Sequence, residues 1–213
     1  MCSPKGGQVV GGFNVHLLPT RPGPVRFRHL SEWQTAVDRV CEAVPERDLY
    51  PADVAEAYTR GAELGYLRGV FAHRTGRGYA QTSVWDCSQV HRKRVLAVPR
   101  LWGALARGLN PLSRLVPVPR VPVPGQTLAL GHVFDVLVEG AGGPRQLGGI
   151  LADLRNRAHG GGADLLAVFL SWGDPLVQLP RILLQKTLRY HTLALPLAGP
   201  LPVPPLYLNI REL

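Results

Sequence analysis

The sequence predicts a mixed α/β (α+β) fold, in which a twisted and mainly antiparallel sheet carries helices on both faces. Residues 126–170 read in order as a strand, a Gly-rich turn, a helix, a second Gly turn and a strand. Residues 66–74 and 78–86 read as two strands joined by Thr75-Gly76-Arg77-Gly78, whose glycines suit a hairpin turn. A strand-helix-strand unit beside a hairpin implies both parallel and antiparallel pairing in the sheet.

The helix expected between residues 144 and 160 has one apolar face. Pro144 suits its first turn, because the first N–H groups of a helix have no partner within the helix and proline lacks that group. The apolar residues at helical spacing are Leu147, Ile150, Leu151, Leu154 and Ala158. Arg145, Asp153, Arg155 and Asn156 lie mostly off this face, and Gly160–Gly162 are expected to end the helix.

The Gly-rich turn of residues 139–143 leads directly into the start of this helix. Backbone N–H groups and the helix dipole could hold an anion at such a position. Glycines in this pattern are also common in a plain strand-turn-helix connection that binds nothing. Both interpretations are open from these residues alone.

The N-terminal half is expected to begin with irregular chain. Residues 1–23 are rich in Gly and Pro without a sustained period, so we expect a loose and flexible extension there. A short strand is expected at residues 25–30. A helix should follow from the N-cap Ser31 to about residue 44. A second helix should start at Pro51 with Val54, Ala55 and Tyr58 inward, and should end at Gly61 and Gly65.

The rest of the chain contains a proline-rich insertion and a C-terminal strand pair. Residues 87–125 form the insertion, with a short helix around residues 101–109. Beyond residue 170, the pattern predicts a helix over residues 176–186 and strands over 188–197 and 206–211. We therefore divide the chain into the extension 1–23 and a single domain, 24–213.

Composition excludes several broad classes. A chain of 213 residues with 46% hydrophobic and 18% charged residues is typical of a globular protein with a substantial core. No run of about 18 uncharged apolar residues predicts a membrane span. Residues 1–24 lack the long apolar core of a secretory signal. Three cysteines without framework spacing favour a reducing cytoplasm.

The net charge of +9 has two explanations. One is an anionic partner, and the other is genomic base composition, because nearly all the basic residues are Arg and Lys occurs only at positions 5, 93 and 186. The densest basic region comprises Arg92, Lys93, Arg94, Arg100, Arg107, Arg114 and Arg120. It lacks the interleaved aromatic residues of common RNA-binding modules, so a nucleic-acid partner is not favoured.

An ordered set of short motifs resembles the GNAT acetyltransferase superfamily, closest to the C-terminal-half domains of bacterial tandem GNAT proteins. The resemblance covers residues 24–212, and each motif alone is weak. The residues that carry it are Asp48-Leu49-Tyr50-Pro51-Ala52-Asp53, Ser83-Val84-Trp85-Asp86, Pro124-Gly125, Asp164-Leu165-Leu166, Asp174-Pro175-Leu176 and Leu206-Tyr207-Leu208.

The resemblance implies an enzyme that transfers an acetyl group from acetyl-CoA to an amine. Its pantetheine arm would pair with the backbone near Val136 and Val138, and its pyrophosphate would bind at Arg145, Gly148 and Gly149. Ile150 and Leu151 stand where the family pattern has a small residue. Two alternatives are therefore kept: a degenerate, non-catalytic GNAT-like binding or assembly module, for which a homodimer is one arrangement, and a basic anion or nucleic-acid binder.

GNAT chemistry needs a base for the acceptor ammonium and often a Tyr acid for the leaving thiolate. Glu139 is the candidate base, and Tyr190 and Tyr207 are the candidate acids. The partners would then be acyl-CoA and an unidentified amine acceptor, without a membrane. Cys87 and His91 lack a second ligand pair, so no metal site is expected. His132 and His191 are expected to be hydrogen-bonded sheet residues, and Asp86 either binds a cationic substrate or caps a turn.

Overall fold

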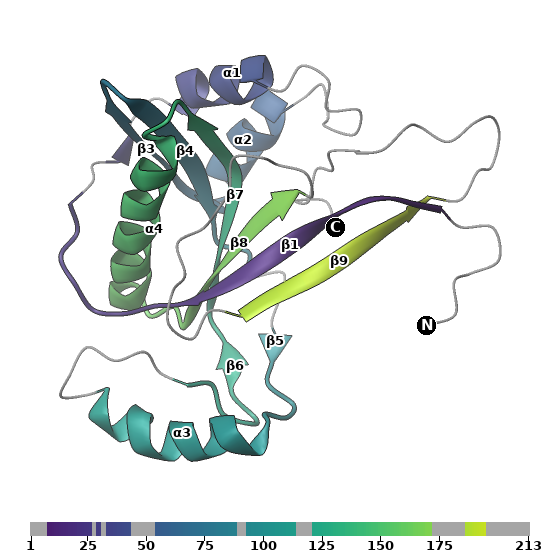
Figure 1. The fold of residues 1–213 in the computed structure, drawn as a ribbon, viewed down its shortest axis with the longest axis vertical. Coiled ribbons are helices and arrows are strands. Elements are labelled where there is room, and N and C mark those ends of the chain that lie inside the picture. The colour runs from purple at the N-terminus through teal and green to yellow at the C-terminus, as the bar shows by residue number, and fades with distance from the viewer. Residues whose placement is uncertain are drawn as a thin grey trace.

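The computed structural model describes residues 8–26, 29–30, 33–43, 54–88, 93–113, 121–171 and 186–194. Within them the chain forms four helices and nine strands (Figure 1). The helices are α1 (Trp33–Ala43), α2 (Val54–Glu63), α3 (Arg100–Leu112) and α4 (Gly143–Gly160). The strands are β1 (Gln8–Pro19), β2 (His29–Leu30), β3 (Leu67–Thr75), β4 (Gly78–Trp85), β5 (Lys93–Arg94), β6 (Thr127–Leu128), β7 (Leu130–Glu139), β8 (Leu165–Ser171) and β9 (Lys186–Ala194).

Seven of these strands form one mixed sheet in the order β2-β3-β4-β7-β8-β1-β9. The pair β7–β8 is parallel, with α4 as its crossover helix, and the other five neighbouring pairs are antiparallel. The hairpin β3–β4 was predicted from the glycines of its turn, and it is present from Leu67↔Trp85 to Thr75↔Gly78. The prediction of a mixed and mainly antiparallel sheet is therefore confirmed.

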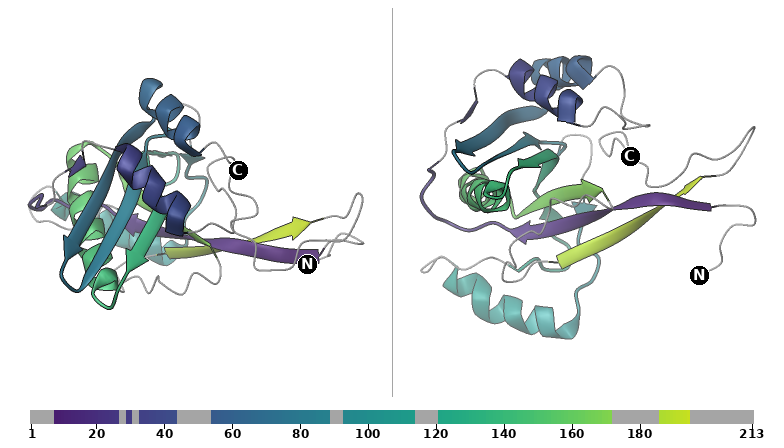
Figure 2. Two further views of the ribbon diagram at one scale, coloured as in Figure 1. Left: turned by 90° about the horizontal axis from the view of Figure 1, so that it is seen from above. Right: turned by 45° about the horizontal axis from the view of Figure 1, so that its top comes forward.

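Helices cover both faces of the sheet (Figures 1 and 2). Alternation along the strands divides the core accordingly, because neighbouring side chains point to opposite faces. Val70 packs with α1 and α2, whereas Phe71 packs with α4. The apolar face predicted for α4 is buried at Leu147, Ile150, Leu151 and Leu154, with Ala158 packed against the same cluster.

The expectation of a loose extension over residues 1–23 is wrong for residues 8–19. They form β1, a long strand that lies between β8 and β9. Phe13 pairs with Ser171 of β8 on one side and with Tyr190 of β9 on the other. Both partners lie more than 150 residues away along the chain, so local composition carries no sign of them.

Residues 20–26 run along the side of α4 and bury polar side chains that lie off its apolar face. Asp153 and Arg155 are only 3% and 6% exposed. The Arg155 Nε donates to the Pro19 carbonyl at 2.7 Å. Asp153 accepts a hydrogen bond from the Arg26 N–H and another from the Arg157 Nε at 3.0 Å. These polar side chains are buried because the N-terminal segment covers them.

Helix α2 ends at Glu63, between the two glycines that were expected to end it. Gly61 lies inside the helix and is buried, and a Cβ at this position would lie 2.1 Å from the Trp85 ring. The glycine therefore makes room for an aromatic side chain and does not end the helix. Gly65, with φ of 70°, follows the helix end as expected. Val54 and Tyr58 point inward, but Ala55 is exposed.

The proline-rich insertion contains α3 and β5, and β5 pairs with β6 just after the insertion; these elements lie below the main sheet in Figure 1. The prediction of a short helix around residues 101–109 is confirmed by α3. The strand expected at 188–197 corresponds to β9, which begins at Lys186. The helix expected over 176–186 falls outside the described residues except for Lys186, and the strand expected over 206–211 falls wholly outside them.

Candidate functional site

Strands β7 and β8 are paired over only part of their length. Their parallel register runs from Leu130↔Leu165 to Val133↔Val168. Beyond this point β7 continues to Glu139 beside β4, and β8 continues to Ser171 beside β1. Figure 1 shows the two strands separating toward their carboxyl ends. Ligands of α/β sheets commonly bind outside the carboxyl ends of strands at such a separation.

A β-bulge lies on β7 directly after the last β7–β8 pair. The register with β4 shifts between Gln81↔Leu137 and Ser83↔Phe134, so two residues of β7 oppose one residue of β4. Asp135 occupies the bulge with φ of 52°, and it is the one non-glycine residue with a positive φ within the described chain. Such backbone is uncommon for a non-glycine residue and often marks a functional position.

The Asp135 carboxylate is held by two hydroxyl groups on the face that α1 and α2 cover. The Tyr58 hydroxyl of α2 donates to Asp135 Oδ2 at 2.5 Å, and the Ser83 hydroxyl of β4 donates to the same oxygen at 2.9 Å. The indole N–H of Trp85 donates to Ser83 Oγ at 2.9 Å. Tyr58 and Trp85 are 1% and 7% exposed, whereas Asp135 is half-buried. The half-buried carboxylate of Asp135 is therefore held by hydroxyl groups among buried aromatic side chains.

The Gly-rich turn between β7 and α4 packs tightly against the β3–β4 hairpin. A Cβ on Gly78 would lie 2.4 Å from the backbone nitrogen of Gly143, and a Cβ on Gly142 would lie 2.9 Å from the Arg77 carbonyl oxygen. Gly140 has φ of 71° and also approaches that carbonyl. These glycines are required by the close approach of two backbones, which is a structural reason for the Gly-rich composition of the turn.

The backbone N–H groups at the start of α4 are largely used within the protein. Gly142 donates to the Arg77 carbonyl at 2.8 Å, and Gly143 donates to the Gly140 carbonyl at 3.0 Å. Gln146 donates to the Gly142 carbonyl at 3.2 Å, and Pro144 has no N–H. A phosphate cradle built from consecutive free N–H groups, as a helix start can provide, is therefore not available at these four positions.

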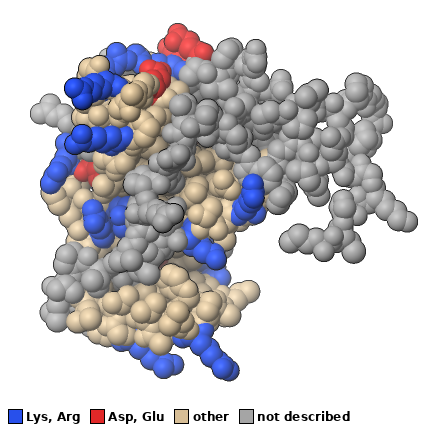
Figure 3. Space-filling view, in the orientation of Figure 1, with Lys and Arg blue, Asp and Glu red and all other residues tan. Residues whose placement is uncertain are grey.

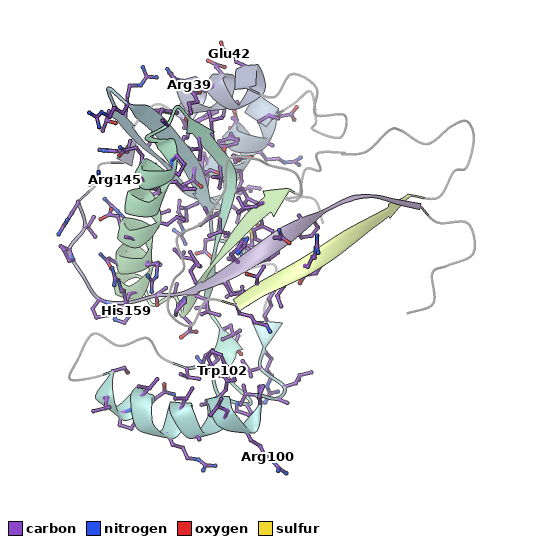
Figure 4. The ribbon with its side chains drawn as sticks, in the orientation of Figure 1. Arg39, Glu42, Arg100, Trp102, Arg145 and His159 are labelled. Atoms are coloured by element: carbon purple, nitrogen blue, oxygen red, sulfur yellow. The ribbon has the colours of Figure 1, made fainter. Side chains whose placement is uncertain are left out.

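Cationic side chains surround the same end of the molecule. Arg74 and Arg77 line a depression of about 410 Å³ between the hairpin and the end of β7. The Arg39 and Arg74 guanidinium groups lie 4.7 and 5.1 Å from the centre of the Tyr79 ring, which stabilises both charges. Burial raises the pKa of the Tyr79 hydroxyl, which donates to Gln81 Oε1 at 2.5 Å. Figure 4 shows Arg39 coming from α1 and Arg145 from the upper end of α4.

The five residues assigned to the cofactor lie on β7 and α4. Val136 and Val138 are buried in the core beneath α4, so only their backbone could contact a ligand. Gly148 and Gly149 are half-buried inside α4, beyond its first turn, and Arg145 is exposed in that turn. The structure thus brings the backbone of β7 and the Arg145 side chain to the same end of the sheet.

The residues assigned to catalysis are not brought together. Glu139 is the last residue of β7, with a 47% exposed side chain that lies 3.9 Å from the Arg39 guanidinium. Tyr190 lies on β9, two strands beyond β8, and stacks on Phe13 with ring centres 4.8 Å apart. Tyr207 lies outside the described residues. Glu139 and Tyr190 are therefore separated by β8 and β1 in the sheet order.

Asp86 serves a structural role at the opposite end of the sheet. Its Oδ1 accepts the Ser88 backbone N–H at 3.0 Å, and its Oδ2 accepts from the Arg68 guanidinium at 2.6 Å. This is the turn-capping alternative considered from the sequence. Asp86 also lines a cavity of about 600 Å³ beneath the C-terminal half of α4, together with apolar side chains of Phe71, Leu130 and Leu154.

The remaining predictions about side-chain chemistry concern metals and histidines. Within the described part of the chain, no group of three or more His, Cys, Asp or Glu side chains could hold a metal ion. His132 is buried on β7 and stacks with Phe134 and Phe169, which agrees with a sheet position. His91 lies outside the described residues. None of the described helices is long and apolar enough to cross a bilayer.

Asp135 was missed by reasoning from the sequence. Val133, Phe134, Val136, Leu137 and Val138 form an apolar run in the sequence, and Asp135 interrupts it. A single carboxylate inside a buried strand is the signal that could have identified it, because an unpaired charge is costly to bury. Its positive φ and its bond to Tyr58 required the structure.

Comparisons with known proteins give no family assignment. No family model, no curated protein and no solved structure matches this chain.

Proposed function

We propose that this chain is an acyltransferase of the GNAT class, which transfers an acyl group from acyl-CoA to an amine. The observation that carries the proposal is the separation of β7 from β8 beyond Val133↔Val168, with the bulge at Asp135 directly after it. The β7-α4-β8 unit, with its Gly turn before α4, also supports the proposal. Separated parallel strands offer backbone groups of β7 to an amide-rich pantetheine arm.

Asp135 is the candidate base in this proposal, in place of Glu139. Its carboxylate would accept a proton from the acceptor ammonium, directly or through one water, and Tyr58 and Ser83 would keep it oriented. The neutral amine nitrogen then forms a bond to the thioester carbonyl carbon while the carbon–sulfur bond breaks. The nitrogen loses one proton as the amide forms and the departing thiolate takes up one, so acyl-CoA and amine give amide and CoA. Tyr190 cannot serve as the acid beside Asp135, because β8 and β1 lie between its strand, β9, and β7.

The phosphates of the donor would be held mainly by arginine side chains. The N–H groups of Gly142, Gly143 and Gln146 are occupied, which leaves a backbone cradle incomplete. Arg77 and Arg145 are exposed on the hairpin and on the first turn of α4. Guanidinium groups bind phosphate oxygens in bidentate geometry, so they can replace backbone donors at the start of α4.

Isothermal titration of the full chain with acetyl-CoA tests the proposal. We expect binding in the micromolar range, and a loss of at least about tenfold in Arg145→Glu, because each charge-assisted bond contributes about 1.5–3 kcal/mol. Arg60→Glu is the matched control, since Arg60 is also exposed but lies on α2. No heat of binding at millimolar acetyl-CoA would end the acyltransferase proposal.

The alternative of a non-catalytic binding or assembly module is favoured by one observation. The Gly-rich turn packs against the hairpin through Gly78 and Gly142, and this contact explains its glycines without a ligand. Under this alternative, the protein folds but neither binds acetyl-CoA nor releases CoA in the presence of amines. A titration without heat, on a chain with a cooperative unfolding transition, would support it.

A further inference from the structure

The insertion that contains α3 forms a lobe of its own beneath the main sheet. We define the α3 lobe as Lys93–Ser113 together with Val121–Leu128. Asn110 connects its two parts, because its side chain accepts from the Val121 N–H at 2.8 Å and donates to the Val121 carbonyl at 3.0 Å. The Gly125 N–H donates to the Val95 carbonyl at 2.8 Å. The inner side of α3 is thereby fixed, and its outer side faces solvent.

The outer side of α3 carries an apolar stripe beside arginines. Leu101, Ala104, Gly108 and Leu112 are spaced along one helical face, and all four are exposed. Arg100 and Arg107 lie next to this stripe and are also exposed. Figure 4 shows Arg100 pointing away from the body, whereas Trp102 points toward it. None of the described helices and strands covers this side of α3 in Figures 1 and 2.

Exposed apolar side chains are concentrated in this lobe. Among the described residues, seven large hydrophobic side chains are exposed, and four of them belong to the α3 lobe. These four are Leu96 at 87%, Leu101 at 71%, Leu112 at 48% and Val123 at 39%. Several exposed leucines on one small lobe exceed the scattered single residues of an ordinary surface, so they indicate a binding surface.

The charge of the lobe has one sign. No Asp or Glu occurs in the sequence between Asp86 and Asp135, whereas this stretch contains seven Lys and Arg residues. Four of these, Lys93, Arg94, Arg100 and Arg107, are described and exposed. Figure 3 shows blue and tan atoms over the lower end of the molecule, where α3 lies. A partner for this surface must therefore be anionic and must also accept leucine side chains.

We propose that the α3 lobe docks on the surface of a bilayer that contains anionic phospholipid. Leu96, Leu101 and Leu112 enter the boundary between headgroups and acyl chains, while the arginines contact lipid phosphates. A groove of about 670 Å³ between α3 and Val123-Pro124 is lined by Val98, Ala106 and both arginines, so it can accept part of one acyl chain. Nucleic acid would pair with the arginines but would leave the leucines in water.

Vesicle co-sedimentation of the full chain tests this surface. The probes are vesicles of pure phosphatidylcholine and vesicles with 30% phosphatidylglycerol, a composition chosen to be about that of an anionic leaflet. We expect at least about tenfold stronger partitioning to the anionic vesicles at low salt, and weaker binding as salt rises, because the attraction of surface charges is screened. Equal partitioning to both vesicles, or none, overturns the proposal.

Two pairs of variants separate a membrane from other anionic partners. Leu96→Ser/Leu101→Ser and Arg100→Gln/Arg107→Gln should each reduce partitioning to anionic vesicles by about tenfold or more. The matched controls are Leu64→Ser, which changes a 56% exposed leucine after α2, and Arg60→Gln/Lys186→Gln, which removes two exposed charges elsewhere. Both controls should bind as the wild type does.

Titration of a short DNA duplex, followed by fluorescence anisotropy, tests nucleic acid as the alternative partner of the α3 lobe. Duplex binding that survives the Leu96→Ser/Leu101→Ser change and is lost with Arg100→Gln/Arg107→Gln, without vesicle binding, would assign the lobe to nucleic acid and overturn the proposal. Vesicle binding that responds to both double variants, in proteins with wild-type circular dichroism, supports it. The result is independent of acetyl-CoA binding, because the α3 lobe shares no residue with the candidate site.

Discussion

The hydroxyl of Tyr58 donates a hydrogen bond to the carboxylate of Asp135 at 2.5 Å, across 77 residues of sequence. This bond joins helix α2 to β7 at the bulge, directly after the point where β7 leaves β8. Asp135 adopts φ of 52° there, a conformation that costs energy unless its surroundings stabilise it. The bonds from Tyr58 and Ser83 supply that stabilisation and fix the carboxylate toward the face of α1 and α2.

Replacing Asp135 by Asn should separate chemistry from folding. Asn tolerates the left-handed backbone and can still accept from Tyr58, so Asp135→Asn should keep its unfolding transition. It cannot accept the acceptor's proton, so the rate of CoA release with an amine should fall by about 10²–10⁴-fold. Glu139→Gln is the comparison, because Glu139 is exposed at the end of the same strand. A large loss in Glu139→Gln with none in Asp135→Asn would restore Glu139 as the base.

Removing the Tyr58 hydroxyl should destabilise the fold. Tyr58→Phe keeps the contacts of the ring with Trp33 and Trp85, but it takes away one hydrogen bond to a half-buried carboxylate. We expect the free energy of unfolding in urea to fall by about 1–3 kcal/mol. A change below about 0.5 kcal/mol would show that the bond contributes little in solution, and the fixed orientation of Asp135 would lose its main support.

The contact between the hairpin and the Gly-rich turn can be tested at Gly78. A Cβ there would lie 2.4 Å from the Gly143 backbone nitrogen, and neither backbone can move without disturbing the other. Gly78→Ala should therefore lower the free energy of unfolding by about 1–3 kcal/mol. Gly76→Ala is the matched control in the same turn, since a Cβ at Gly76 meets nothing within 4 Å. Equal melting temperatures for the two variants would contradict the close approach.

Asp86 should make the stability depend on pH in the acid range. Burial acts to raise the pKa of Asp86, but hydrogen bonds from Ser88 and Arg68 outweigh it and bring the pKa to about 2. Because this is below the unfolded value of about 3.9, its contribution is present above about pH 4 and is lost as pH falls toward 2. The Arg68 side chain is 57% exposed, so the contribution is at most about 1 kcal/mol.

The measurement for Asp86 is urea unfolding at a series of pH values. Asp86→Asn should show a flatter decline of stability than the wild type below about pH 4. Asp38→Asn is a suitable control, because Asp38 is exposed on α1. Identical curves for wild type and Asp86→Asn would mean that the bonds from Ser88 and Arg68 do not persist in solution.

Local patterns in the sequence were sufficient to predict the elements that pack against segments close to them in the sequence. The face of α4 with Leu147 and Leu151, and the β3–β4 hairpin around Gly76, depend on spacings of a few residues. Strand β1 could not be predicted in this way. Phe13 and Val15 alternate with polar residues only briefly, and the partners of β1 on β8 and β9 come from the far end of the sequence.

The candidate site was predictable in position but not in its chemistry. The strand-turn-helix unit indicated the end of the sheet at which the candidate site lies, with Arg145 on the first turn of α4. The glycines of the turn suggested a phosphate cradle, whereas Gly142 and Gly143 serve the contact with the hairpin. The backbone conformation of Asp135 and its bond to Tyr58 could not be predicted, because they arise from tertiary packing, which sequence spacing does not contain.

Hydrogen–deuterium exchange with and without saturating acetyl-CoA tests the central claim most directly, because it locates the donor as well as detecting it. If the acyl-CoA arm lies along β7 where it leaves β8, the amides of residues 134–139 and of the first turn of α4 should exchange more slowly with acetyl-CoA present. The amides of α3 should not change. Unchanged exchange over residues 134–146, or protection confined to other segments, would contradict the proposed site.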